Sequence, residues 1–230
     1  YIFIRVYITM GRQLFQFTHL LTILLFCGFL LFLAGLDLKI MITIILGKRK
    51  ESAMKDYTKL SQEEKDALVK KAMDVGFQTE TDYGNCIQSC LYGLYCAFPD
   101  FGITKDMLKA SFGIAGGTGC SLMGTCGALN AAAWAISLCE GRPIDDLGGK
   151  YGHCHAKIRE VVDKFNKEYD GVLCADVMRQ RMGDVYDWKT PEGLKGYNDH
   201  QGTFHCATAV AFCAEIIARM IVDGELKNDN

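Results

Sequence analysis

Residues 154–169 read CHAKIREVVDKFNKEY, and this stretch decides the fold class. Its apolar residues recur at i, i+3, i+4, i+7 and i+11, at positions Ile158, Val161, Val162, Phe165 and Tyr169. That spacing gathers them on one face of a helix and leaves the charged residues on the opposite face. Few segments of the chain alternate apolar and polar residues with period two, as a half-buried strand would. The chain is therefore predicted to be all-α.

Helix-capping and helix-breaking residues mark the neighbouring elements. Ser61 and Glu64 form a capping box at the start of a helix that we expect to end at Gly76. Other helices are expected at 86–98 after Asn85, 105–112 after Thr104, 126–140 after Thr125, 172–182 after Gly171, and from Thr203 to about Met220. Residues 183–202 contain turn residues and no period, which predicts a long surface loop. The expected architecture is a compact bundle of about six short helices with a Gly-rich loop, preceded by a hydrophobic N-terminal helix.

Composition excludes several classes of protein. The 230 residues are 50% hydrophobic and 23% charged and include only three prolines, which is unlike a disordered or collagen-like chain. The net charge of −2 provides no basic footprint, so no nucleic acid partner is expected. This average hides a division of the chain. Residues 1–53 contain six Lys and Arg against two Asp and Glu, net +4, whereas the remainder contains 19 against 25, net −6.

The hydrophobic leader, residues 1–53, allows two interpretations. It contains an uncharged run long enough for a single transmembrane helix at about 18–36. Lys and Arg are denser after this run, so a cytoplasmic globular domain anchored to the membrane would follow. Alternatively, translation starts at Met54 after codons that can spell a purine-rich ribosome-binding sequence, and the leader is untranslated upstream sequence. The protein would then be cytoplasmic and would have no membrane partner. Either way, residues 54–230 are expected to form one cysteine-rich helical domain.

The spacing of the eleven cysteines is unlike that of common metal and redox motifs. The chain has no Cys-x-x-Cys pair, which argues against a zinc ribbon, a ferredoxin run and a thioredoxin motif. Ligands from separate helices would escape this test. If the domain is cytoplasmic, its reducing surroundings keep most thiols free. Cysteine here therefore indicates catalysis, metal binding or packing rather than a disulfide framework.

Four cysteines are predicted to lie in the first turn of a helix: Cys86, Cys126, Cys174 and Cys206. There, unpaired backbone N–H groups and the helix dipole favour a thiolate, the form that attacks disulfides and binds metals. Any one of them alone is compatible with packing, but four together favour function. We interpret Cys90, Cys96, Cys139 and Cys213 as packing residues in helix interiors. Cys120 and Cys154 fit either role, and Cys27 lies in the leader.

Four segments of the chain resemble a known family. They are NCIQSCLYGLYCAF (85–98), GIAGGTGCSLMGTCGALNAAAWAI (113–136), FNKEYDGVLCADVM (165–178) and HCATAVAFCAEIIARM (205–220). Together they resemble the bacterial C_GCAxxG_C_C family of redox-active proteins, over about residues 60–222. That family has four cysteines and a Cys-Gly-Ala-x-x-Gly motif. The resemblance assigns the cysteines to Cys86, Cys126, Cys174 and Cys206 and the motif to residues 126–131, with Ala131 replacing the last glycine. The small substitution suggests a relaxed helix contact rather than lost chemistry.

The leading functional hypothesis is a thiol–disulfide oxidoreductase. A thiolate at Cys86 or Cys126 would attack a partner disulfide, and a second family cysteine would resolve the mixed disulfide. This requires the four helix N-termini to converge. The protein's redox partner is not identified by the sequence, and no cofactor is assigned with certainty.

Two alternatives remain open. The same four cysteines could hold an iron–sulfur cluster or another metal, with His205 beside Cys206, and with His153 and His155 near Cys154. Metal analysis and a visible spectrum would separate this from thiol exchange. A third hypothesis, suggested by the family's occurrence near transporter genes, is a membrane-tethered redox-sensing accessory of a transporter. It depends on the leader.

Two surrounding features complete the predicted site. The glycines between Gly113 and Gly124 are followed by a helix, but no strand precedes them and no Gly-Lys-Ser/Thr follows, so phosphate binding is not favoured. We expect instead that these glycines let the backbone pass close to the cysteine cluster. Trp134 is interpreted as a core residue, and Trp188 is expected to cover the site from the 183–202 segment.

Overall fold

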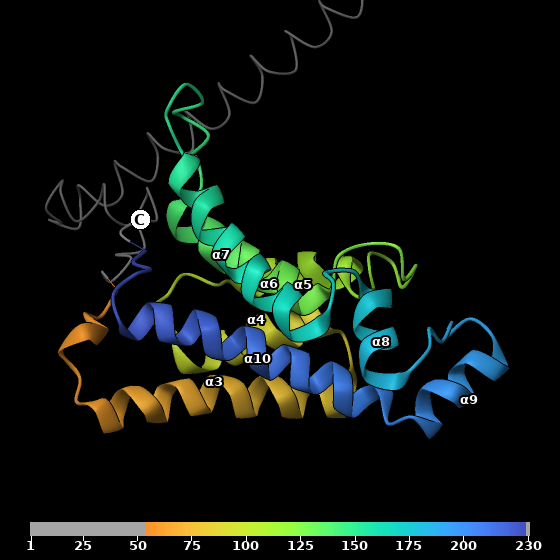
Figure 1. Ribbon diagram of the computed structural model, residues 1–230. Coiled ribbons are helices and arrows are strands. Elements are labelled where there is room, and N and C mark those ends of the chain that lie inside the picture. The colour runs from red at the N-terminus through yellow and green to blue at the C-terminus, as the bar shows by residue number, and fades with distance from the viewer. Residues whose placement is uncertain (1–53, 229–230) are drawn as a thin grey trace, which may run out of the picture. The chain divides into compact units, whose positions relative to one another are not determined.

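The computed structural model describes residues 54–228 (Figure 1). The predicted leader at 1–53, with its candidate transmembrane helix at 18–36, lies outside the described residues. Within residues 54–228 there are eight α-helices, two 3-10 turns (Tyr57–Lys59 and Phe112–Ile114) and no strand, which confirms the all-α class. The helices are α3 (Gln62–Tyr83), α4 (Cys86–Ala97), α5 (Lys105–Ser111), α6 (Gly127–Glu140), α7 (Gly152–Tyr169), α8 (Cys174–Met182), α9 (Pro191–Asp199) and α10 (Gly202–Val222).

The two longest helices, α3 and α10, lie side by side and run in opposite directions (Figure 1). Helix α4 packs against both, and α6 then packs against α4 and α10, with α7 outside α6. Helices α8 and α9 pack against the N-terminal part of α10. As a result, the end of α3 and the beginnings of α4, α8 and α10 lie at one end of this bundle.

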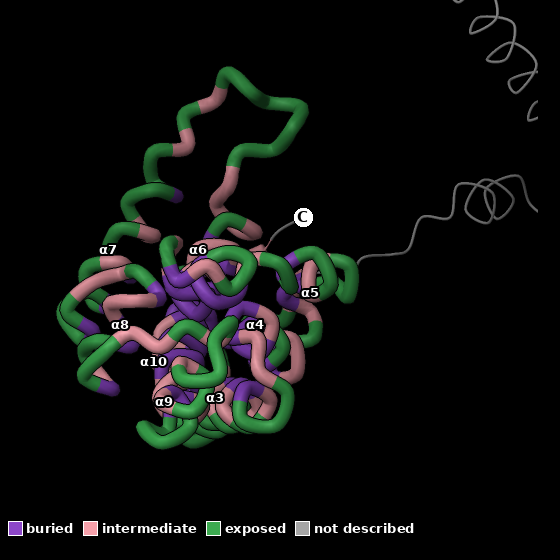
Figure 2. The backbone as a smooth tube through the Cα atoms, turned by 90° about the vertical axis from the view of Figure 1, so that its right-hand side faces the viewer, coloured by how far each residue is buried: buried purple, intermediate pink, exposed green. Residues whose placement is uncertain are grey.

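Helix α10 forms the centre of the core. Eleven of its residues are buried, and the buried segments converge where α4, α6 and α10 meet (Figure 2). By length and composition, α10 is also apolar enough to cross a membrane. Its contacts with α3, α4 and α6 show why it is so apolar, since a core helix must bury most of its circumference. By contrast, the 141–151 segment between α6 and α7 stands away from the core and is largely exposed (Figure 2).

Three of the predicted helix starts are confirmed, at Ser61, Asn85 and Thr104. The capping box of Ser61 and Glu64 is present, with both reciprocal hydrogen bonds. The side chain of Asn85 accepts a hydrogen bond from the N–H of Gln88, and that of Thr104 accepts one from the N–H of Met107. These caps satisfy N–H groups that have no partner within the helix, so they locate the start of each helix closely.

The predicted end of the first helix at Gly76 is wrong, because α3 continues to Tyr83. Gly76 is buried at a close crossing between α3 and α4. A Cβ atom built on Gly93 of α4 would lie 2.3 Å from the carbonyl oxygen of Ala72 and 2.9 Å from the nitrogen of Gly76. The glycine is therefore required for close helix packing rather than for helix termination, and two further turns bring α3 to the pocket described below.

This crossing predicts that Gly93→Ala destabilises the protein. The new methyl group would overlap backbone atoms of α3, which cannot rotate away, so we expect a loss of at least about 1–3 kcal/mol. Denaturant unfolding of the variant and the wild type would measure it. Gly148→Ala is the matched control, because a Cβ there meets nothing within 4 Å. A Gly93→Ala variant as stable as the control would show that the helices cross less closely than described.

The predicted loop at 183–202 is wrong in part, since it contains α9. Thr190 caps this helix by accepting a hydrogen bond from the N–H of Gly193, and Pro191 occupies its first turn. Both are ordinary helix-start signals, but the glycines that follow favour a loop, so the sequence does not predict this helix. The predicted cap at Thr203 is also wrong, because the residue at the cap position is Gln201, two residues earlier, in a left-handed conformation (φ 54°), and α10 begins at Gly202.

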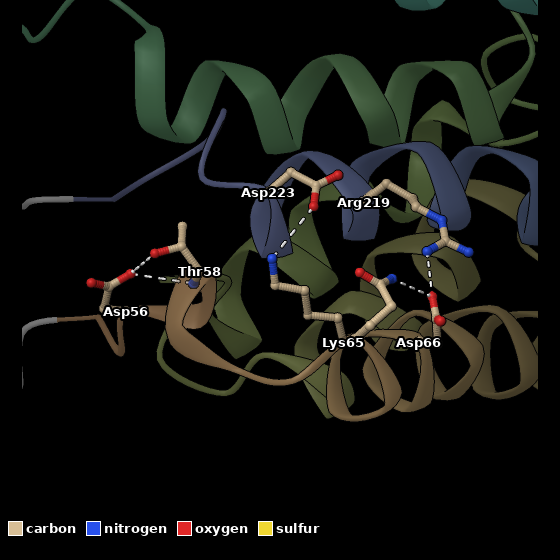
Figure 3. Close-up of polar contacts among 7 residues, drawn as sticks. Asp56, Thr58, Lys65, Asp66, Arg219 and Asp223 are labelled. Carbon is tan, nitrogen blue, oxygen red and sulfur yellow. Dashed lines mark hydrogen bonds and ion pairs between the residues drawn. The ribbon is translucent and has the colours of Figure 1, made fainter.

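Ion pairs join the beginning of α3 to the end of α10 (Figure 3). Lys65 Nζ lies 3.7 Å from Asp223 Oδ1, and Arg219 Nη1 donates a hydrogen bond of 2.5 Å to Asp66 Oδ1. Gln62 donates a second hydrogen bond to the same Asp66 oxygen, at 3.2 Å. Exposed pairs of this kind are worth little individually, so packing along the helices carries most of the stability.

Candidate functional site

The four cysteines predicted from the sequence line one pocket of about 260 Å³. Cys86 is the first residue of α4, Cys126 immediately precedes α6, Cys174 is the first residue of α8, and Cys206 is the fifth residue of α10. Cys86, Cys126 and Cys174 are buried and Cys206 is half-buried. None of these four cysteines is disulfide-bonded.

The predicted first-turn positions hold for two of these residues. Cys86 and Cys174 are the first residues of their helices. Cys126 is itself the residue that precedes α6, rather than following a Thr125 cap. For Cys206 the prediction is wrong, because the earlier start of α10 puts this residue in the second helical turn. Helix-terminal N–H groups are therefore available to Cys86, Cys126 and Cys174 more directly than to Cys206.

Backbone hydrogen bonds place the starts of α6 and α8 next to each other. The N–H of Cys126 donates to the carbonyl of Val172 at 2.8 Å, and the N–H of Cys174 donates to the carbonyl of Gly124 at 3.0 Å. Thr125 and Leu173 form an isolated antiparallel bridge between these bonds. Two cysteines that are 48 positions apart in the sequence are thereby fixed on either side of one short backbone ladder.

The glycine-rich loop allows a close approach of its backbone to the cysteines, as predicted. Gly117 adopts a left-handed conformation (φ 69°), and a Cβ built there would lie 3.0 Å from the Cβ of Cys174. Gly116 is also left-handed (φ 61°), and a Cβ there would lie 3.0 Å from the Sγ of Cys120 and 3.1 Å from the ring of Trp188. Only glycine combines this backbone geometry with so little space.

Cys86 is the cysteine of the pocket whose pKa is lowered. The groups that lower it are the thiol of Cys126 and the backbone N–H groups of Gly116, Gly127 and Ile87. Together these groups outweigh the cost of burying the charge and lower the pKa of Cys86 from about 9 to about 6. At neutral pH the sulfur is therefore mostly ionised, the form required of a sulfur nucleophile.

The glycine after Cys126 has a steric role at this sulfur. A Cβ built on Gly127 would lie 2.4 Å from the Sγ of Cys86, far inside van der Waals contact. The absence of a side chain lets the sulfur rest against the start of α6, where the N–H of Gly127 donates to it. The Cys-Gly pair thus supplies two hydrogen-bond donors and the space for their acceptor.

The other three thiols of the pocket are held protonated. The pKa of Cys126 is raised well above its usual value, first because its proton is shared with Cys86 and then because the site is buried. Burial raises the pKa of Cys174 to about 12 and that of Cys206 well above its usual range. The hydroxyl of Tyr197 lies 3.4 Å from the Sγ of Cys206 and donates to it. One thiolate therefore faces three thiols across the pocket.

The remaining cysteines divide nearly as expected. Cys90 and Cys213 are fully buried core residues, whereas Cys96 and Cys139 are half-buried and are each the second-last residue of their helix rather than in its interior. Cys154 is buried away from the pocket, with its Sγ 3.9 Å from the hydroxyl of Ser137. Cys120 is exposed and lines the pocket.

Three further residues line the pocket. Trp188 does so as predicted, and its ring packs edge-on against that of Tyr197, with 5.5 Å between the ring centres. Tyr197 and Glu80 were not predicted. Tyr197 lies in α9, the helix that the sequence concealed, and Glu80 lies on the part of α3 beyond Gly76. A prediction with the correct ends of α3 and α9 would have placed Tyr197 and Glu80 near the pocket.

The described side chains do not assemble a metal centre. In residues 54–228, no three His, Cys, Asp or Glu side chains lie close enough together to hold one ion. Cys154, with its neighbours His153 and His155, lies outside the cysteine pocket, and so does His205. The geometry supports a single activated thiolate with a hydrogen-bonded thiol more directly than it supports a four-thiolate ligand set.

The family assignment rests on the same part of the chain. The sequence model of a family described as "Putative redox-active protein (C_GCAxxG_C_C)" matches residues 83–220. The chain belongs to the C_GCAxxG_C_C family. No curated protein and no solved structure matches the chain. In this C_GCAxxG_C_C protein, the region that carries the family match also contains nearly every residue of the cysteine pocket, with Glu80 just before its start.

Proposed function

We propose that this redox-active protein carries out thiol–disulfide exchange, with Cys86 as the nucleophile and Cys126 as the resolving thiol. The observation that carries the proposal is that Cys86 and Cys126 line the same pocket and interact, which lowers the pKa of Cys86 and raises that of Cys126. Two-step exchange requires such a pair, with one sulfur that ionises readily and a second thiol beside it.

The first step opens the substrate disulfide. The Cys86 thiolate attacks one sulfur of the substrate, forming a Cys86–substrate disulfide, and the other substrate sulfur leaves as a thiolate. The cavity of about 260 Å³ admits a small disulfide or the exposed disulfide of a peptide segment. Apolar side chains, including Val177 and Met178, line it, so a substrate of low charge is favoured.

The second step depends on how the first one changes Cys126. Its proton is retained because Cys86 is a thiolate. Once Cys86 is part of a mixed disulfide, both the hydrogen-bond acceptor and the negative charge are lost, so the pKa of Cys126 falls. The Cys126 thiolate then attacks the Cys86 sulfur, a Cys86–Cys126 disulfide forms, and the second substrate sulfur leaves. Two protein thiols are oxidised and one substrate disulfide is reduced.

Trapping the mixed disulfide tests this assignment. A Cys126→Ser variant treated with 2-hydroxyethyl disulfide is expected to accumulate one adduct, on Cys86, whereas the wild type should proceed to a Cys86–Cys126 disulfide. Peptide mass mapping measures both products. Cys96→Ser, at a half-buried cysteine outside the pocket, is the control and should behave as wild type. An internal disulfide that omits Cys86 in the wild type would contradict the proposal.

A further inference from the structure

A buried carboxyl group lies in the same pocket. Glu80, in the last turn of α3, is only 5% exposed and lines the cavity with the four cysteines. Its Oε2 atom is buried and has no hydrogen-bond partner. A buried carboxyl oxygen without a partner is costly, and glutamate is rarely retained in such a position without a role.

No positive charge compensates Glu80. The titratable groups that act on it, or that it acts on, are Cys86 and Cys90 from α4, Cys174 from α8, Tyr197 from α9 and Cys206 from α10. Cys120 and Cys126 also line the cavity. None of these groups is a cation, and no Lys, Arg or His lines the cavity. The pocket therefore disfavours a second negative charge beside the Cys86 thiolate.

These surroundings keep Glu80 protonated. Burial and the negative charge of Cys86 raise the pKa of its carboxyl from 4.5 to about 8. The hydroxyl of Ser89 offsets this effect only in part. At neutral pH the pocket thus holds an ionised thiol and a neutral carboxylic acid, whereas ordinarily the thiol would be protonated and the carboxyl group ionised.

We propose that Glu80 is the proton donor and acceptor of the cysteine pocket. This inference rests on the proposed exchange reaction and adds to it the route of the proton. In the first step, the carboxyl of Glu80 gives its proton to the leaving substrate thiolate, which departs as a neutral thiol. In the second step, the carboxylate takes the proton of Cys126, so that the Cys126 thiolate can attack Cys86. Glu80 is then protonated again, and the second substrate sulfur leaves as a thiolate.

The proton balance explains why a neutral acid is useful here. The attack converts the Cys86 thiolate into a disulfide and creates a new thiolate in the same apolar cavity. A thiolate with an ordinary pKa above 8 is a poor leaving group in such surroundings unless it is protonated. A leaving group that is stable as an anion needs no proton. The contribution of Glu80 should therefore depend on the leaving group.

The test compares Glu80→Gln with the wild type on two small disulfides. Glutamine retains the volume and a carbonyl acceptor but cannot exchange a proton at these pH values. With 2-hydroxyethyl disulfide, whose leaving thiol is weakly acidic, the variant is expected to react about 100-fold more slowly at pH 7. With 2,2′-dipyridyl disulfide, whose leaving group is stable without a proton, the rate should change less than about threefold, by the same reasoning. Stopped-flow measurement of single turnovers gives both rates.

Glu63→Gln is the matched control, since it removes an exposed carboxyl from the same helix outside the pocket. Equal slowing of Glu80→Gln on both substrates would show a structural role and overturn the inference, as would unchanged rates on both. If the wild type reacts with neither disulfide, or if Cys86→Ser reacts as the wild type does, the proposed exchange reaction itself fails. The two failures are thus distinguishable.

Thermal stability provides a readout that does not need catalysis. Because the pKa of Glu80 is higher in the folded than in the unfolded chain, its contribution favours folding at low pH and is lost as the pH rises from about 4.5 to about 8. The melting temperature of the wild type relative to Glu80→Gln should therefore fall across this range. A constant difference between pH 5 and pH 8 would contradict a neutral buried carboxyl at position 80.

Discussion

Replacing Cys86 by serine is expected to reduce the rate of exchange with a small disulfide by on the order of 1000-fold or more. A serine hydroxyl remains protonated at neutral pH and is a poor nucleophile, so the groups that lower the pKa of Cys86 would have no anion to stabilise. Single-turnover reaction with 2-hydroxyethyl disulfide at pH 7 measures the loss.

The other pocket thiols should not replace Cys86. Burial keeps Cys174 and Cys206 protonated. Loss of the Cys86 charge lowers the pKa of Cys126 in this variant too, but burial still holds that pKa above its usual value, and no mixed disulfide lies beside Cys126 for it to attack. Cys96→Ser controls for the loss of one thiol elsewhere and should retain the wild-type rate. A Cys86→Ser variant within tenfold of the wild type would assign the nucleophile to a different cysteine.

Gly127→Ala should have the second-largest effect, because it changes both the reactivity of Cys86 and the packing of α6. The added methyl group would lie 2.4 Å from the Cys86 sulfur, which must then move away from the N–H of Gly127 and the thiol of Cys126. Without these donors the pKa of Cys86 should return toward 9, and only about one molecule in a hundred would carry a thiolate at pH 7. Thiol alkylation at pH 7 is expected to slow by about 10- to 100-fold.

Stability separates this steric effect from helix propensity. Alanine ordinarily favours a helix over glycine by about 1 kcal/mol, so a gain would be expected if space were available. The overlap with Cys86 instead predicts a loss of about 1–3 kcal/mol in denaturant unfolding. Gly113→Ala is the control, because a Cβ there meets nothing within 4 Å. A stabilised Gly127→Ala protein with unchanged thiol reactivity would mean that Cys86 does not rest against α6.

Much of the fold could be predicted because helix starts are encoded locally. The caps at Ser61, Asn85 and Thr104 each require one side chain and a backbone N–H two or three residues away, so a short window of sequence contains the whole interaction. Helix ends and the roles of glycines are harder to predict from the sequence. A local window predicts that the helix ends at Gly76, yet this glycine makes a contact with α4 that no local window contains.

The site was predictable as a set of residues but not as a mechanism. The four cysteines could be selected from their expected helix positions and from the family resemblance, and all four line one pocket. Their different ionisation could not be predicted, because it depends on donors from the loop at Gly116 and the start of α6. Glu80 was missed for a related reason, since only the continuation of α3 beyond Gly76 brings it to the cysteines.

The pH dependence of Cys86 alkylation tests the central claim most directly. Each cysteine of the wild-type protein would be labelled with iodoacetamide between pH 4 and pH 10 and quantified by peptide mass spectrometry, with Cys96 as an internal reference. The rate at Cys86 is predicted to rise with a midpoint near pH 6 and then to level off. A midpoint near pH 9, the ordinary value for a cysteine thiol, would show that the pocket does not stabilise a thiolate at Cys86.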